Sequence, residues 1–394
     1  MFMDDRDKAE LSDGRAGSYV FQPGGYRAFV PRPLPPPDLA IDPTLLALLS
    51  SADRAIGRLD GAVALVPDPD FFVFMYVRRE AVLSSQIEGT HASLMDVLEF
   101  EAAQARMDDR VDVVEIANYV TAMRSGLERL QSLPVSRRLL CEIHEVLMKN
   151  VRGGEPQKTP GKFRRSQNWI GGASPQTARF VPPPWEEVDQ AFSDLERFLH
   201  DRDLTPPLIK IGLAHAQFES IHPFLDGNGR IGRLLITLWL VEEGILSSPL
   251  LYPSLFLKEH REEYIDRLQA IRDRGEWEAW LRFFVDGLGQ VATEATDRAL
   301  EIVRLRDRDR VLIESQMGRR VPNALRFLDE LFSHPVVSAK LVESLLSVSQ
   351  PTAGSLVNDL RRIGILREMT GRRRGRLFAY DEYLQLFPGT HDRA

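Results

Sequence analysis

The chain has 394 residues, of which 43% are hydrophobic and 27% charged, and its 50 basic and 57 acidic side chains give a net charge of −7. These values are typical of a globular protein and argue against one that coats nucleic acid over its whole surface. The single cysteine, Cys141, excludes a disulfide framework and a cysteine-based zinc site. The charged N-terminus and the short apolar runs predict a cytoplasmic protein with neither a secretory signal nor a membrane partner.

The first 38 residues carry a proline run, Pro31–Pro37, which predicts an extended arm lying on the rest of the chain. Helical periodicity begins after it, with capping residues and terminal glycines that mark successive helices. We expect a helical region over 39–125, a larger helical core over 126–290 and a connecting helix over 291–316. The helices predicted in chain order are 42–61, 71–89, two between 94 and 133, 136–150, 185–200, 207–221, 230–243, 260–274 and 277–315.

Two short strands interrupt this helical pattern. Trp169–Gly172 and Arg179–Val181 flank a glycine-containing turn and predict a small hairpin. The fold class that follows is mostly α, with a helical core and a small β-hairpin, and with a separate module after residue 316.

The C-terminal module, predicted over 317–387, is basic. Between residues 319 and 376 it has eleven Lys or Arg against five Asp or Glu. Helices over 336–349 and 349–366, followed by a strand, the basic turn Arg372–Arg374 and a second strand, predict a winged helix. Such a module contacts DNA in one interpretation. In the other it docks a protein, including a second copy of the chain as a homodimer.

The strongest chemical signal is the run His-Pro-Phe-Leu-Asp-Gly-Asn-Gly-Arg-Ile-Gly-Arg at 222–233, between two predicted helices. Proline at 223 disfavours helical backbone at His222 and ends the first helix there. Gly227, Asn228 and Gly229 allow a tight turn, and with the start of the next helix they predict a cradle of N–H groups for an anion.

The charged residues of this run complete a phosphate site. Arg230 and Arg233 lie three apart on the first turn of a helix, and arginine binds phosphate in a bidentate fashion. Asp226 beside such a cradle implies a cation, and one carboxylate with phosphate oxygens and waters is a usual Mg²⁺ arrangement. Histidine, with an ordinary pKa of about 6.5, makes His222 a candidate general base. Together these residues predict transfer of a phosphate-bearing group from a magnesium–nucleotide to a hydroxyl.

The run matches the HPFx(D/E)GNGRxxR signature completely, and the chain resembles the Fic (filamentation induced by cAMP) family over nearly its whole length after Pro37. The resemblance implies a protein adenylyltransferase, which moves AMP from ATP to a Tyr, Thr or Ser hydroxyl of a target protein or of the enzyme itself. It also implies a buried, packing role for Phe224. The implied roles are a catalytic base at His222, Mg²⁺ binding at Asp226, binding of the α- and β-phosphates at Gly227, Asn228, Gly229 and Arg230, and binding of the γ-phosphate at Arg233.

Three other segments resemble parts of the family. Residues 84–89 resemble its inhibitory motif, (S/T)xxxE(G/N), which implies that Glu88, supported by Ser84, pairs with Arg233 and displaces the γ-phosphate. The segment 160–184 resembles its flap, whose edge can pair with the backbone of a target. Gln217 and His260 are candidates for the lining of the nucleotide pocket.

Two other functions stay open at this point. One is a DNA-binding regulator whose Fic fold senses a nucleotide without transferring it. The other is an enzyme with the same pocket that removes AMP or transfers a different phosphate group.

Overall fold

The computed structural model of the chain describes residues 14–64, 70–103, 111–152, 154–202, 205–371 and 375–387. It contains two compact units. The first comprises 1–56, 121–247 and 253–291, and the second 57–120, 248–252 and 292–394. These units cut across the segments expected from the sequence, since α2 (Pro43–Ala64) and α12 (Trp277–Gln316) each contribute residues to both. The boundaries drawn in the sequence stay predictions.

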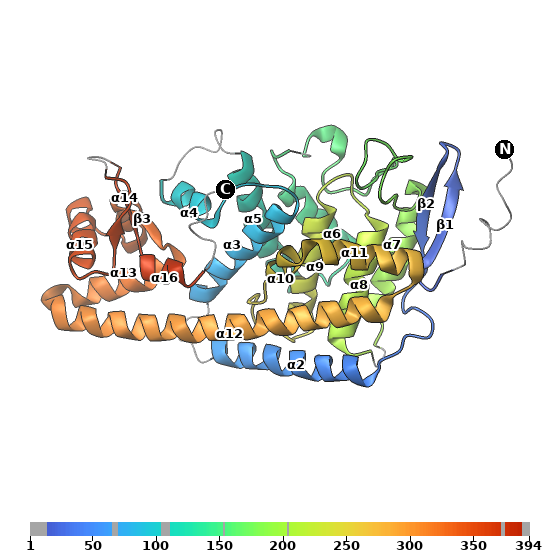
Figure 1. The fold of residues 1–394 in the computed structure, drawn as a ribbon. Coiled ribbons are helices and arrows are strands. Elements are labelled where there is room, and N and C mark those ends of the chain that lie inside the picture. Colours follow the sequence, from blue (N-terminus) through green and yellow to red (C-terminus); the bar gives the residue numbers. More distant parts are fainter. Residues whose placement is uncertain are drawn as a thin grey trace. The chain divides into compact units, whose positions relative to one another are not determined.

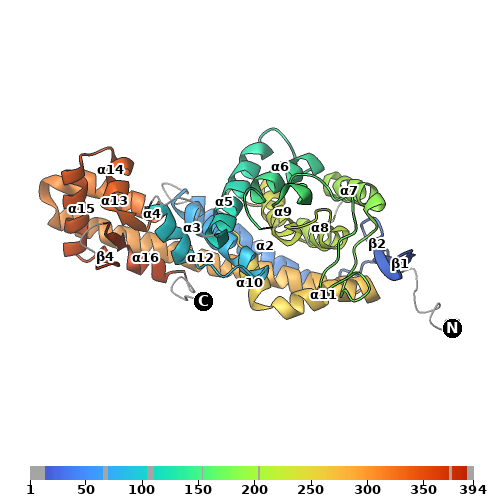
Figure 2. The ribbon, with the colours of Figure 1, turned by 90° about the horizontal axis from the view of Figure 1, so that it is seen from above.

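Four helices form the centre of the first unit, with α7 and α9 on α8 and α6 on α7 and α9 (Figures 1 and 2). Every residue of α8 from Leu208 to Ile221 is buried, including the polar side chains of Lys210, His215, Gln217, Glu219 and Ser220. The 222–233 run connects α8 to α9, so both ends of its loop are held by the core. The bounds are α6 (Arg137–Leu147), α7 (Trp185–His200), α8 (Pro207–Ile221) and α9 (Asn228–Glu242).

The remaining helices of this unit surround that core. Trp280 of α12 is fully buried and donates from its indole N–H to the carbonyl of Gly212 at 2.9 Å, which fixes α12 against α8. The helix predicted at 260–274 is α11, and a shorter α10 precedes it. The bounds are α5 (Val111–Leu130), which enters the unit at Thr121, η2 (Pro156–Lys158), α10 (Ser254–Glu259) and α11 (Arg261–Arg274).

A β-hairpin stands where the sequence predicts an extended arm. Strands β1 (Gly17–Gln22) and β2 (Tyr26–Pro31) are antiparallel, with Gly17 opposite Pro31 and Gln22 opposite Tyr26 (Figure 1). The turn contains Gly25 at φ 79°, a conformation that glycine adopts without strain. Strand β2 packs on α8, so the segment does lie on the core, but as a paired element. The proline run follows the hairpin and begins at its last residue.

The second unit combines N-terminal helices with the C-terminal module. Helix α13 packs on α3, and α4 packs on β3. The three strands of the module are antiparallel in the order β3-β5-β4. The bounds are α3 (Asp70–Ile87), α4 (Leu94–Ala103), η3 (Gly318–Arg320), α13 (Val321–Ser333), β3 (Val336–Ser338), α14 (Ala339–Leu346), α15 (Gln350–Arg362), β4 (Arg367–Glu368), β5 (Leu377–Ala379) and α16 (Asp381–Gln385).

The module has the helices and the strand pair of a winged helix, with one correction. The segment 336–349, expected to be helical throughout, begins as strand β3, and helix α14 starts only after Ser338. The hydroxyl of Ser338 accepts from the N–H of Leu341 at 3.2 Å, which caps α14 at that point. The basic turn Arg372–Arg374 lies outside the described residues. Among the described residues, every helix is too short or too polar to span a lipid bilayer.

Candidate active site

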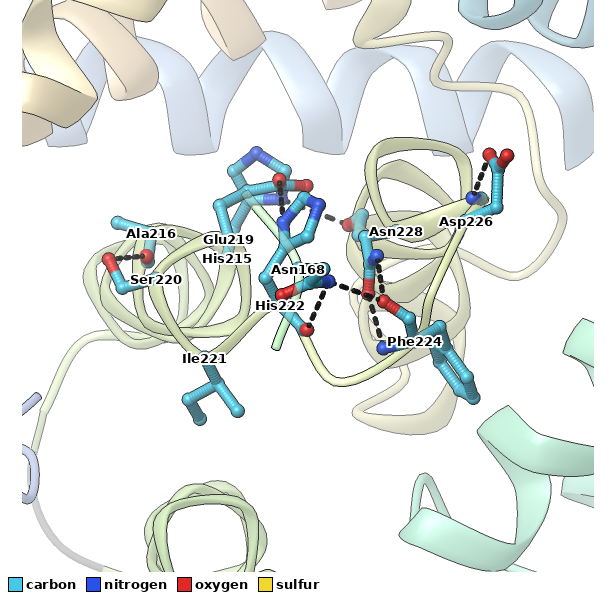
Figure 3. Close-up of polar contacts among 12 residues, drawn as sticks. Asn168, His215, Ala216, Glu219, Ser220, Ile221, His222, Phe224, Asp226 and Asn228 are labelled. Atoms are coloured by element: carbon cyan, nitrogen blue, oxygen red, sulfur yellow. Dashed lines mark hydrogen bonds and ion pairs between the residues drawn. The ribbon is translucent and has the colours of Figure 1, made fainter. Parts of the chain in front are cut away.

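The loop between α8 and α9 has an unusual backbone at both ends. His222 follows the last residue of α8 in the left-handed conformation, with φ 50° and ψ 61°. Gly227 precedes α9 at φ 75°. A left-handed backbone is strained for a residue other than glycine and often marks a functional position. The helix therefore ends at His222, as the following proline predicts, and the imidazole lies at the entrance of the loop (Figure 3).

Side-chain amides hold the loop closed. The Asn228 carbonyl oxygen accepts from the Phe224 N–H at 2.8 Å, and its NH₂ group donates to the Phe224 carbonyl at 2.8 Å. Asn168 donates to the same carbonyl at 2.8 Å (Figure 3). The Asn228 side chain thus shapes the loop. Any contact of this residue with an anion falls to its main-chain N–H, because the first turn of a helix leaves such groups outside its own hydrogen bonds.

Phe224 anchors the loop to the core. Its ring is fully buried and stacks on the imidazole of His144 from α6, with the ring centres 3.8 Å apart and the planes 6° from parallel. The ring of Phe163 meets it edge-on at 5.3 Å. The packing role implied for Phe224 is confirmed.

His144 is a second loop contact that the sequence reading missed. Its Nδ1 accepts from the Gly161 N–H at 2.8 Å, so the neutral ring carries its proton on Nε2 and donates it to the Asp226 carbonyl at 3.0 Å. Burial lowers the pKa of this imidazole to about 4. A β-carbon on Gly227 would lie only 2.8 Å from the sulfur of Met148, one helical turn after His144. Helix α6 and the residue that follows it therefore contact the loop and support it.

Arg164 connects the loop to the segment before the hairpin. Its N–H donates to the Pro223 carbonyl at 2.8 Å, and its guanidinium donates to the carbonyls of His222 at 2.9 Å and Pro183 at 2.7 Å. The side chain is buried, which lowers its pKa to about 10. This arginine is the last residue of the Gly161–Arg164 sequence that resembles the family's flap.

The predicted hairpin is present and short. The N–H groups of Ile170 and Phe180 each donate to the other residue's carbonyl, at 2.8 and 3.1 Å. The carbonyl of Val181 accepts from the Phe29 N–H of β2 at 2.9 Å. Residues next to a bridge pair direct their peptide groups to the opposite edge. Strand β2 therefore covers one edge of the hairpin, and the other edge begins at Trp169, whose side chain is 40% exposed.

The charged residues of the run occupy different environments. Arg230 and Arg233 are 4% and 1% exposed. The Asp226 side chain is 42% exposed, and its Oδ1 accepts from the Gly227 N–H at 2.7 Å and lies 3.9 Å from Nη2 of Arg230. Two buried guanidinium groups beside a helix N-terminus create a strongly anion-attracting place, and the accessible carboxylate next to it suits a hard cation.

Comparison with known proteins agrees with this geometry. Residues 46–128 match the Fic/DOC family N-terminal model, and residues 134–240 match the Fic/DOC family model. The chain thus carries a Fic/DOC N-terminal domain and a Fic/DOC domain over these residues. Residues 325–378 of this Fic protein also match a model described as an HTH DNA binding domain.

Curated relatives of this Fic protein are similar over part of their length. A probable protein adenylyltransferase of Aquifex aeolicus is 29% identical over 202 residues, 51% of this chain and 57% of the relative. The protein adenylyltransferase Fic of Aedes aegypti is 26% identical over 221 residues, 55% of this chain and 39% of the relative. The chain spans about half the length of the curated relatives it matches.

Solved structures give the fold of the Fic protein. A Fic family protein from Desulfovibrio desulfuricans superposes with a TM-score of 0.57 at 20% identity, covering 87% of this chain and 98% of that one. At this identity the likeness shows the shared fold alone.

The two residues that are predicted to line the nucleotide pocket make other contacts in this structure. Gln217 is buried and donates from its amide to the carbonyl of Arg32 at 2.8 Å, which holds the N-terminal segment. His260 stacks on Phe256 at 4.2 Å and lines a cavity of about 430 Å³ with residues of α11 and α12. Their contact with a nucleotide stays a prediction.

The candidate inhibitory residues lie in the second unit. Ser84 is fully buried on α3, and Glu88 is exposed one residue beyond the end of that helix. Gly89 follows at φ 95° and ends the turn, as its position in the sequence indicates. Because the two units are described separately, the pairing of Glu88 with Arg233 stays a prediction.

Proposed function

We propose that this Fic protein transfers AMP from ATP to a hydroxyl group of a protein, either a target or the enzyme itself. The observation that carries the proposal is the loop between α8 and α9. It places an imidazole at one end, a helix N-terminus at the other and two buried arginines on the helix that follows. The names of the relatives, protein adenylyltransferases, support the same reaction.

In this proposal the chain's own residues bind the triphosphate and move one proton. The start of α9 and Arg230 bind the α- and β-phosphates, and Arg233 binds the γ-phosphate. His222 accepts the proton of the target hydroxyl while its oxygen forms a bond to the α-phosphorus and pyrophosphate departs. Holding these groups in line supplies most of the rate enhancement in such transfers.

Asp226 suits Mg²⁺ in the same site. Its carboxylate is accessible, lies beside the predicted phosphate cradle and offers the hard oxygen ligand that this ion prefers. Among the described residues no group of three or more His, Cys, Asp or Glu forms a complete metal site, so the phosphates and waters would supply the other ligands. The ion, when bound, neutralises charge on the phosphates.

The free edge of the hairpin suits the protein substrate. Strand β2 covers the edge at Val181, whereas the edge at Trp169 has peptide groups directed away from the Ile170–Phe180 pair. An extended segment of the substrate can add to such an edge by main-chain hydrogen bonds without a fixed sequence. This arrangement supports a protein substrate and leaves its identity unspecified.

The decisive experiment compares two forms of labelled ATP with the full chain and Mg²⁺. We expect protein to become labelled from α-³²P-ATP, and pyrophosphate to form in equal amount. The same incubation with γ-³²P-ATP leaves protein unlabelled, because the γ-phosphate departs. Label from the γ position would mean kinase-like transfer and would overturn the assignment. Adding unlabelled AMP-modified protein as a substrate tests the reverse, AMP-removing activity.

A second function, contact with DNA, is favoured by the match of 325–378 to an HTH model. Helix α15 is the second helix after β3, and its exposed side chains include Gln350, Asn358 and Arg361. In a winged helix this element enters the major groove. The basic residues Arg372–Arg374, which lie between β4 and β5 in the sequence, would contact the DNA backbone.

Fluorescence anisotropy of the full chain with a random DNA duplex tests this second function. We expect binding at 50 mM salt that weakens steeply as salt rises, since phosphate contacts release counterions. Replacing Arg372–Arg374 together by serine lowers the slope of log affinity against log salt by up to about three. Replacing Arg197, an arginine on α7 of the other unit, leaves the slope unchanged. No binding at low salt favours protein docking as the role of the module.

A further inference from the structure

A buried carboxylate lies beside the candidate base. Glu219 precedes His222 by three residues, at the end of α8, and its Oε2 is 3.8 Å from Nδ1 of the imidazole (Figure 3). The side chains are 8% and 17% exposed. A carboxylate facing one ring nitrogen of a histidine sets which nitrogen carries the proton. The opposite nitrogen, Nε2, is then left to accept a proton from a substrate.

Helix α9 leaves space for the Glu219 carboxylate. Gly232, on α9, lies so close that a β-carbon there would overlap Oε1 of Glu219. Glycine costs about 1 kcal/mol relative to alanine in the interior of a helix, so its presence in α9 calls for a reason. The reason that the structure offers is space for the Glu219 side chain.

An arginine from α11 fixes the same turn. The guanidinium of Arg272 donates to the carbonyl of Glu219 and to the hydroxyl of Ser220, each at 3.2 Å. It also lies 3.7 Å from the centre of the Phe180 ring in the hairpin. Burial lowers the pKa of Arg272 to about 10, and the charge of Glu219 opposes that shift, so the guanidinium stays charged. Arg272 therefore holds the last turn of α8 in place.

We propose that Glu219 is a positioning residue for His222, holding the imidazole with its proton on Nδ1 and its Nε2 directed to the substrate hydroxyl. This inference rests on the proposed function. In the transfer, the hydroxyl proton moves to Nε2, the hydroxyl oxygen bonds to the α-phosphorus and the bond from that phosphorus to the bridging oxygen breaks. The carboxylate then stabilises the imidazolium that forms.

The other charged groups near His222 oppose a positive charge on the imidazole, so the negative charge of Glu219 matters more for its protonation. Arg164 donates to the His222 carbonyl, and Arg272 donates to the Glu219 carbonyl. Arg230 and Arg233 are buried on α9, which packs on α8. All four are cations and oppose a positive imidazole. His215 on α8 is held by the Gly232 carbonyl and the Tyr264 hydroxyl at 3.0 Å each, and burial lowers its pKa to about 3. The Glu219 carboxylate, 3.8 Å from Nδ1 of His222, is an anion that offsets these cations.

The test replaces Glu219 by glutamine in the full chain. We expect kcat for AMP transfer to fall about tenfold to a hundredfold, while KM for ATP changes by less than about twofold. The acid limb of the kcat profile moves to lower pH, because a neutral amide no longer stabilises the protonated ring. Glu219→Asp keeps the charge and keeps the limb near its original pH. The matched control, Glu187→Gln on the exposed face of α7, changes neither quantity.

A measurement without turnover separates this inference from the proposed function. In ¹⁵N NMR of the wild-type chain, the His222 ring, assigned by its loss in His222→Ala, is expected in the Nδ1–H form. An Nε2–H ring in the wild type overturns the inference, as does Glu219→Gln with wild-type kcat and pH profile. If the wild type has the Nδ1–H form yet neither it nor Glu88→Gly transfers AMP, the proposed function fails and the positioning of the ring stands.

Discussion

Replacing His222 by alanine is expected to lower AMP transfer at least about a hundredfold without unfolding the chain. The imidazole is the residue at the loop entrance that can take the hydroxyl proton, and its main-chain carbonyl, bound by Arg164, is retained in the variant. The loop keeps its shape because it depends on Asn228, Asn168 and the ring of Phe224, none of which the substitution removes. The loss therefore falls on the chemical step.

The measurement is incorporation of label from α-³²P-ATP, together with the Kd for ATP and the melting temperature. We expect the Kd to stay within about threefold, since the phosphate-binding groups are on α9. His200→Ala is the matched control, because that imidazole is on α7 and bonds to the Val135 carbonyl, far along the chain from the loop. Full labelling by His222→Ala would exclude this residue as the base.

The loop itself is predictable because its chemistry is local in the sequence. Proline after His222 ends α8, Gly227 allows the turn, and the two arginines fall on the first two turns of α9. Each of these rules acts over fewer than five residues. The same holds for the helices, whose periodicity gives their existence and, within a few residues, their ends.

The residues that support the loop are not predictable in this way. His144 is 82 positions from the Asp226 carbonyl that it binds, and Arg164 is 58 positions from the His222 carbonyl. Nothing in the local pattern of α6 separates a histidine that donates to a distant loop from one that packs in the core. Glu219 is not among the residues predicted from the sequence, although its place one turn before His222 and the glycine in the interior of α9 are signals that could have indicated it.

Two elements of the structure differ from the prediction, and each has its own cause. The proline run at 31–37 favours extended backbone without pairing, whereas the segment before it forms two strands joined by a turn with the glycine pair 24–25. In the C-terminal module, the helix predicted over 336–349 includes Val336–Ser338, because a strand of three residues is too short to show a clear periodicity. Strand β2 pairs with its neighbour β1 and is also bonded at Phe29 to the Val181 carbonyl, whereas β3 pairs with β5, about 40 residues further along the chain.

Replacing Glu88 by glycine is expected to raise self-labelling from α-³²P-ATP by at least about tenfold. The resemblance of 84–89 to the inhibitory motif predicts that this carboxylate competes with the γ-phosphate for Arg233. A guanidinium binds a carboxylate and a phosphate with the same pair of donors, so the two anions exclude each other. Arg233 is 1% exposed, and a buried guanidinium binds its partner far more strongly than one in water.

Two further variants separate loss of the charge from loss of the side chain. Glu88→Gln retains the shape and removes the charge, and we expect it to raise labelling nearly as much as glycine. The double variant Glu88→Gly with His222→Ala is expected to show no labelling, which assigns the gain to the same active site. Ser84 is buried on α3, so Ser84→Ala tests the support of the helix end and is expected to raise labelling by less. Labelling unchanged in both Glu88 variants would mean that this carboxylate does not restrain the enzyme, and that its position at the end of α3 is structural.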